Sequence, residues 1–209
     1  MKSGKKALLL ALCAVLLVAA TVMGTMAYLT SQDQVINTFT IGKVAIKLDE
    51  AKVNEEGVAV EPAERVRENA YHLMPGHSYT KDPTVHVAAD SEDSWIFVKV
   101  ENGIADFEAA TAEGSYTKIA DQITANGWVA LEGVPGVYYK EYTKEATDTD
   151  LAVFGSFKIA DDANTASGWG DITAENTKVI VTAYAVQKDG FDTAKAAWDA
   201  TFGAPVSGN

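Results

Sequence analysis

The sequence predicts an all-β fold: an antiparallel β-sandwich of jelly-roll type with one or two short helices, preceded by an N-terminal signal helix. Short runs rich in Val, Ile, Phe, Tyr and Thr recur along the chain, and such runs favour β-strands. Gly, Asp, Asn or Pro separate these runs, as turn residues do. About eight strands with long polar connections are typical of sandwiches and jelly rolls.

The first expected strand covers residues 37–48 and contains a defect. Phe39 and Ile41 share one parity of alternation, and the apolar residues after Gly42 share the other. A β-bulge at Gly42 would return both sets to one face of the sheet, because one extra residue reverses the alternation. Further strands are expected at residues 83–88, 95–100, 127–131, 136–142, 151–159 and 178–186.

Helical segments are few. Residues 193–202 predict a short helix, with Thr193 as its N-cap and Gly203 as its stop signal. Residues 104–112 have room for a turn or two of helix. Three polar segments are expected to be loops, at 52–70, 143–150 and 160–177.

Residues 1–27 have the three parts of a secretory signal peptide. Three lysines lie within the first six residues, an uncharged stretch rich in Leu, Val and Ala follows, and the triplet Thr25-Met26-Ala27 ends it. This order predicts cleavage between Ala27 and Tyr28, and therefore export. An uncleaved transmembrane anchor is the alternative, because the uncharged stretch is long enough to span a bilayer.

We divide the remaining chain into an extension at 28–36 and one domain at 37–209. The composition of this chain excludes several classes of function. Loss of the leader's lysines leaves 14 basic and 29 acidic side chains, a formal net charge of −15. Such a surface repels nucleic acid and anionic lipid, so we expect no nucleic-acid partner and membrane contact only through an uncleaved leader. The single cysteine, Cys13, lies in the leader, so the mature chain has no disulfide.

Three stretches together resemble the TasA and camelysin family of Gram-positive bacteria. Residues 5–31 resemble leaders processed by the SipW-type signal peptidase, and residues 35–48 resemble the first mature strand of its cargo proteins. Residues 73–82 match a Leu-x-Pro-Gly-x-x-x-x-Lys-Asp signature of the family. Residues 181–191 resemble the closing strand of one subgroup, whereas residues 102–177 show no alignment.

The resemblance implies a jelly-roll protein secreted to the cell envelope or biofilm matrix, where it forms fibres by donor-strand exchange. In that mechanism the N-terminal strand of one subunit completes the sheet of the next. The candidate donor segment is 28–36, whose apolar side chains are Tyr28, Leu29, Val35 and Ile36. An added strand satisfies the unpaired backbone groups of an open sheet edge. Two alternatives stay open: a flexible lead-in to the first strand, and a monomeric surface module that binds sugar or a host protein.

A camelysin-like metalloprotease is a third alternative, because camelysin is classed as one. The mature chain has only His72, His77 and His86, and no His-Glu-x-x-His helix motif. His72 and His77 flank a Met-Pro-Gly turn and are able to approach each other. His86 has the opposite parity to its valine neighbours and is expected to face solvent or a loop. We therefore expect no enzyme activity and no catalytic residues.

Two loops rich in carboxylates are the weak candidates for a metal site. They contain Asp148, Asp150, Asp161 and Asp162. Calcium requires six to eight oxygen ligands, and neither loop has the spacing of an EF-hand. We expect no cofactor, with calcium at these loops as the open alternative.

Overall fold

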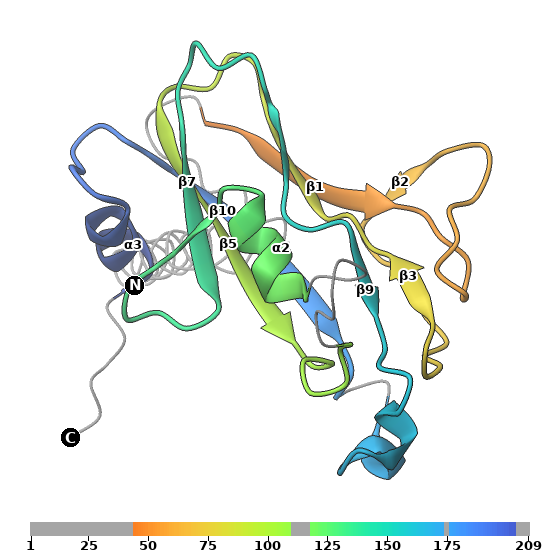
Figure 1. The fold of residues 1–209 in the computed structure, drawn as a ribbon. Coiled ribbons are helices and arrows are strands. Elements are labelled where there is room, and N and C mark those ends of the chain that lie inside the picture. The colour runs from red at the N-terminus through yellow and green to blue at the C-terminus, as the bar shows by residue number, and fades with distance from the viewer. Residues whose placement is uncertain (1–43, 110–117, 174–175, 204–209) are drawn as a thin grey trace, which may run out of the picture. The chain divides into compact units, whose positions relative to one another are not determined.

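The computed structural model describes residues 44–109, 118–173 and 176–203. The expected leader, the donor segment 28–36 and the bulge at Gly42 lie outside these residues. The described chain is mostly β, with antiparallel sheets and two short α-helices, which is consistent with a β-sandwich (Figure 1). Within it, no helix has both the length and the apolar character needed to cross a bilayer.

The first four-stranded sheet has the order β2-β1-β4-β8 and is antiparallel throughout. Its strands are β1 (Ile46–Ala51), β2 (Arg65–Val66), β4 (Thr84–Val87) and β8 (Asp150–Ala152). Cα pairing places Lys47 opposite His86 and His86 opposite Asp150. These three side chains therefore share one face of the sheet, because paired residues in a ladder point the same way.

The second four-stranded sheet has the order β10-β5-β7-β6 and contains the two longest strands of the described chain. Its strands are β5 (Ser94–Asn102), β6 (Val129–Ala130), β7 (Val137–Tyr142) and β10 (Val179–Gln187). Figure 1 shows β5, β7 and β10 side by side. The short strands β3 (Ser78–Thr80) and β9 (Ser156–Lys158) form a separate antiparallel pair.

The expected strands at 83–88, 95–100, 127–131, 136–142 and 178–186 are confirmed, with shifted ends. The single strand expected at 151–159 is wrong, because the chain leaves one sheet after Ala152 and enters another at Ser156. Gly155 lies at this change, where its N–H donates to the Gln122 side chain. The first strand begins only at Ile46 in the described chain and continues to Ala51, beyond its expected end.

The helix expected at 193–202 is confirmed as α3 (Ala194–Phe202). Thr193 caps it by accepting a hydrogen bond from the Ala196 N–H at 3.1 Å, and Gly203 ends it with a φ of 86°. Helix α2 (Ile119–Ala125) was not expected from the sequence. The loop expected at 160–177 contains two 3₁₀ turns, η1 (Ala163–Thr165) and η2 (Trp169–Asp171).

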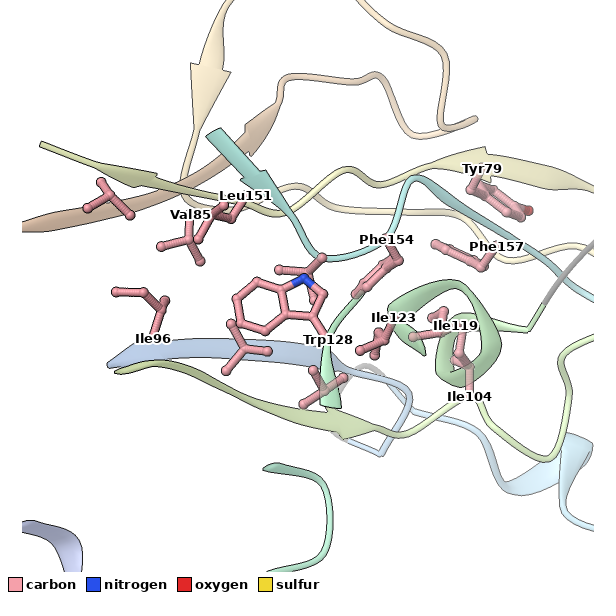
Figure 2. Packing of buried hydrophobic residues seen from close by; sticks show 14 of the residues in the cluster. Tyr79, Val85, Ile96, Ile104, Ile119, Ile123, Trp128, Leu151, Phe154 and Phe157 are labelled. Carbon is pink, nitrogen blue, oxygen red and sulfur yellow. The ribbon is translucent and has the colours of Figure 1, made fainter. Parts of the chain in front are cut away.

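The main hydrophobic core takes side chains from both four-stranded sheets and from α2. Val85 and Val98 are completely buried, as is Phe154 after β8. Figure 2 shows Trp128 in the middle of the labelled core side chains; its ring is 1% exposed and its indole N–H donates to the Ala152 carbonyl at 2.8 Å. A second cluster lies where α3 covers the other face of the β5–β10 sheet, with Phe97 and Trp198 in contact.

Candidate functional site

Two strand edges are unpaired at one margin of the described structure. Strand β10 pairs with β5 over its full length, and no other described strand pairs with it. In β1, the segment 46–49 pairs with β4, and β2 reaches only Glu50 and Ala51 on the other side. Because β1 lies close to β10, the open edges of the two sheets adjoin. We call residues 44–49 and 179–183 together the β1–β10 seam.

The apolar side chains at the β1–β10 seam contact the main core but are not fully buried. They are Val44, Ile46, Leu48, Val179, Val181 and Ala183. The next residue of β10, Ile180, is 44% exposed. The seam therefore combines apolar surface with strand edges that no other described strand pairs with, which are the two features that an added strand requires.

The sequence-predicted donor residues Tyr28, Leu29, Val35 and Ile36 lie outside the described residues, as does the cleavage site at Ala27. The structure describes the two strand edges of the β1–β10 seam, but it does not describe residues 28–36.

A network of charged side chains covers the outer face of the first sheet. Asp49, on β1, is its centre: its carboxylate accepts from Lys47 Nζ at 2.7 Å, from His86 Nε2 at 2.8 Å and from Arg65 Nε. The other ring nitrogen of His86 contacts Asp150 Oδ1 at 2.7 Å. Although it lies on an outer face, the Asp49 side chain is only 2% exposed, because these longer side chains cover it.

Burial and pairing act against each other on the pKa values of this network. Burial by itself raises the pKa of Asp49, but hydrogen bonds from Lys47, Arg65 and His86 outweigh it and hold that pKa well below 3.8. Burial lowers the pKa of His86, whereas its bonds to Asp150 and Asp49 outweigh this and raise that pKa above 6.5. The ionised state of both side chains is therefore the stable one near pH 5.

His86 lies on the face opposite Val85 and Val87, as its parity predicts, and its side chain there is 28% exposed. The two carboxylate partners that it contacts on that face were not predicted. Alternation of polar residues in β1 and β4 indicated the face. The pairing of Lys47, His86 and Asp150 depends on strand register, which no local signal in the sequence supplies.

The three histidines differ in their contacts. Both ring nitrogens are engaged by carboxylates, so neither is left to activate a nucleophile or bind a metal. His72 and His77 are exposed, and their backbone groups, rather than their rings, hold the turn between them. Across the described residues, no group of three or more His, Cys, Asp or Glu is arranged to hold a metal ion.

The four weak metal candidates have separate partners in the described structure. Asp148 accepts from the Asp150 N–H at 3.1 Å, and Asp150 contacts His86. Asp161 accepts from Lys158 Nζ at 3.0 Å. Asp162 precedes η1 and contributes its carbonyl to that turn. Asp148 and Asp150 thus lie beside His86, whereas Asp161 and Asp162 lie at the start of η1.

Comparison with known proteins identifies no relative: no family model, no curated protein and no solved structure matches the chain.

Proposed function

We propose that this chain is an exported, non-enzymatic structural protein of jelly-roll type that assembles through residues 28–36. In this proposal a SipW-type signal peptidase removes residues 1–27, and the new chain end adds to the β1–β10 seam of a neighbouring copy. The product is a fibre in the envelope or extracellular matrix of a Gram-positive bacterium. The resemblance to the TasA and camelysin family supports this assignment.

The proposal rests on two features of the β1–β10 seam: its edges pair with no further strand among the described residues, and its apolar side chains are incompletely buried. A nine-residue strand, β10, offers its outer edge to no described strand, and long unpaired edges are normally protected in proteins that stay monomeric. The partly buried Ile46 and Val181 contact the core from the two sides of the seam. An incoming strand would cover both and pair with the free edge.

The first experiment compares the mature chain, starting at Tyr28, with a variant that lacks residues 28–36. Negative-stain electron microscopy is expected to show filaments of the mature chain and dispersed particles of the variant. Circular dichroism of the variant is expected to keep the β signature, because residues 28–36 lie before the domain. Filaments that persist without residues 28–36 contradict the donor role, and a mature chain that stays monomeric at high concentration favours the binding-module alternative.

The second experiment tests the acceptor edge with a matched control. Ile180→Lys places a charge on β10, where edge lysines oppose strand addition. Val129→Lys places the same charge on β6, the opposite edge strand of the same sheet, where Val129 is 51% exposed. Filament yield is expected to fall for Ile180→Lys and to stay near the unmodified level for Val129→Lys. Equal yields for the two variants contradict the assignment of the acceptor edge.

A further inference from the structure

A cluster of polar side chains lies on the core side of β1, separate from the charged network on the outer face. Lys81 Nζ donates to Glu50 Oε2 at 2.6 Å, and Asn69 Nδ2 donates to Glu50 Oε1 at 2.9 Å. The amine and the carboxamide thus occupy the two oxygens of a single carboxylate. Lys81 and Glu50 are both buried, with side chains 11% and 6% exposed.

The backbone holds the carboxamide of Asn69 in one orientation. Its Oδ1 accepts from the Val53 N–H at 2.9 Å, and its Nδ2 also donates to the Ala51 carbonyl at 2.8 Å. Because an N–H only donates and a carbonyl only accepts, the oxygen and nitrogen of the amide are not interchangeable here. Tyr71 lines the site, with its ring centroid 5.8 Å from Lys81 Nζ.

We propose that Lys81 and Asn69 join in an intramolecular isopeptide bond, with Glu50 as the proton carrier. The cluster contains each group that this reaction requires: an amine, a carboxamide carbon whose oxygen already accepts a backbone hydrogen bond, and a carboxylate in contact with both nitrogens. A salt bridge alone would require only the lysine and the glutamate. The Asn69 carboxamide, which contacts the other oxygen of Glu50, is the third group that the reaction requires.

The reaction balances without any added reagent. Glu50 takes a proton from the ammonium of Lys81, and the neutral Nζ attacks Cγ of Asn69. The Nζ–Cγ bond forms while the C=O electrons move onto Oδ1, where the Val53 N–H stabilises the developing charge. Glu50 passes protons from Nζ to Nδ2, the Cγ–Nδ2 bond breaks, and ammonia leaves. The product is a secondary amide, and nothing is oxidised or reduced.

Preorganisation supplies the rate of this reaction. Glu50 holds the Lys81 amine and the Asn69 carboxamide on the two oxygens of one carboxylate, which replaces a bimolecular encounter. Well-oriented pairs reach effective molarities on the order of 10⁵ M or more. A carboxylate positioned to move protons adds roughly 10²- to 10⁴-fold. Burial of Lys81 and Glu50 excludes the water that would otherwise compete for their hydrogen bonds.

Mass spectrometry of the full purified chain tests the proposal. The intact mass is expected to be lower by about 17 Da, one ammonia, than the mass calculated for the chain ends found by sequencing. Trypsin is expected to leave peptide 68–99 uncut after Lys81, because a lysine acylated at Nζ is not cleaved. An unmodified chain gives peptides 68–81 and 82–99 instead.

Three variants assign the roles within the cluster. Lys81→Arg is expected to restore the full mass, and Glu50→Gln to slow bond formation by at least about 100-fold. Asn69→Asp is expected to form the same product by losing water, about 18 Da, so that its peptide 68–99 matches that of the unmodified chain. Lys52→Arg, at the exposed Lys52–Glu64 pair, is the matched control and is expected to retain the ammonia loss.

Two results would overturn the inference. One is an intact mass equal to the calculated mass in folded protein kept for days at 37 °C. The other is an ammonia loss that persists in Lys81→Arg with normal tryptic cleavage elsewhere, because this indicates a cyclic imide at Asn69 alone. Circular dichroism of each variant confirms that the fold is retained. If Glu50→Gln fails to fold, Asn69→Asp still decides between the outcomes, because only a bond to Lys81 leaves peptide 68–99 uncut after Lys81, whereas a cyclic imide at position 69 leaves that site open to trypsin.

Discussion

Replacing Asp49 by Asn removes the central charge of the network on the first sheet while keeping the size of the side chain. In the native chain, this carboxylate is 2% exposed and accepts bonds from Lys47, Arg65 and His86. An Asn side chain presents only one oxygen as acceptor, and its amide group donates. The three cationic partners would therefore share one neutral acceptor.

The size of the effect follows from the burial on each side of these contacts. Removing one member of a buried ion pair costs about 3–5 kcal/mol, whereas exposed pairs contribute about 0.2–1 kcal/mol. Asp49 is buried, but the side chains of Lys47, Arg65 and His86 are 61%, 36% and 28% exposed. Solvent screens the partners and reduces the loss, so we expect Asp49→Asn to lower the free energy of unfolding by about 2 kcal/mol.

The expected loss depends on pH in both directions. The folded pKa of Asp49 is depressed below 3.8, so its stabilisation is present above pH 3.8 and disappears as pH falls through the folded pKa. The folded pKa of His86 is raised above 6.5, so its stabilisation is complete below pH 6.5 and disappears as pH rises through the folded pKa. The difference between native chain and variant is therefore expected to be largest between pH 4 and 6.5.

Urea unfolding followed by tryptophan fluorescence at pH 3, 5.5 and 9 measures this difference. Asp150→Asn is the matched control, because Asp150 contacts His86 as well but is 66% exposed; its expected effect is below about 1 kcal/mol. Equal losses for the two variants, or a loss for Asp49→Asn that does not shrink at pH 3, would refute the reasoning that burial of Asp49 makes it the centre of the network.

Two further predictions concern the core. Trp128→Ala is expected to lower the free energy of unfolding by about 4 kcal/mol, since the ring is 1% exposed at the centre of the cluster; urea unfolding measures it, and a loss below about 1 kcal/mol contradicts it. Glu108→Ala removes the carboxylate that accepts from the Ile119 N–H at 2.8 Å, at the start of α2. We expect a loss of about 2 kcal/mol and faster amide hydrogen exchange in α2; unchanged exchange there argues against this cap.

Local sequence signals predicted most of the strands and the helix at the end of the domain. Runs around Val85, Val98 and Val181 were recognisable because strand residues alternate and turn residues bound them. Thr193 and Gly203 marked α3, because both positions have specific hydrogen-bonding or backbone requirements. These features depend on neighbours within a few residues, so the chain carries them in its local order.

Helix α2 was missed because tertiary contacts define its start. Its N-cap residue, Lys118, makes no side-chain cap bond. Glu108, which lies 11 residues before Ile119 and outside the helix, accepts the Ile119 N–H instead. The change of sheet between Ala152 and Ser156 was missed for a similar reason. Apolar residues continue through that segment, and only the positions of β4 and β3 decide which sheet each part joins.

By itself, the sequence determined the β-rich class, the acidic charge and the absence of cysteine after Cys13, and it predicted where the mature chain begins. The tertiary structure alone decided which polar side chains meet. Asp49 contacts His86, and Glu50 contacts both Lys81 and Asn69, across separations that no periodic pattern encodes. The physical reason is strand register. Neighbouring β1 residues point to opposite faces of the sheet, so a slip of one residue would turn Asp49 toward the core and Glu50 toward the outer face.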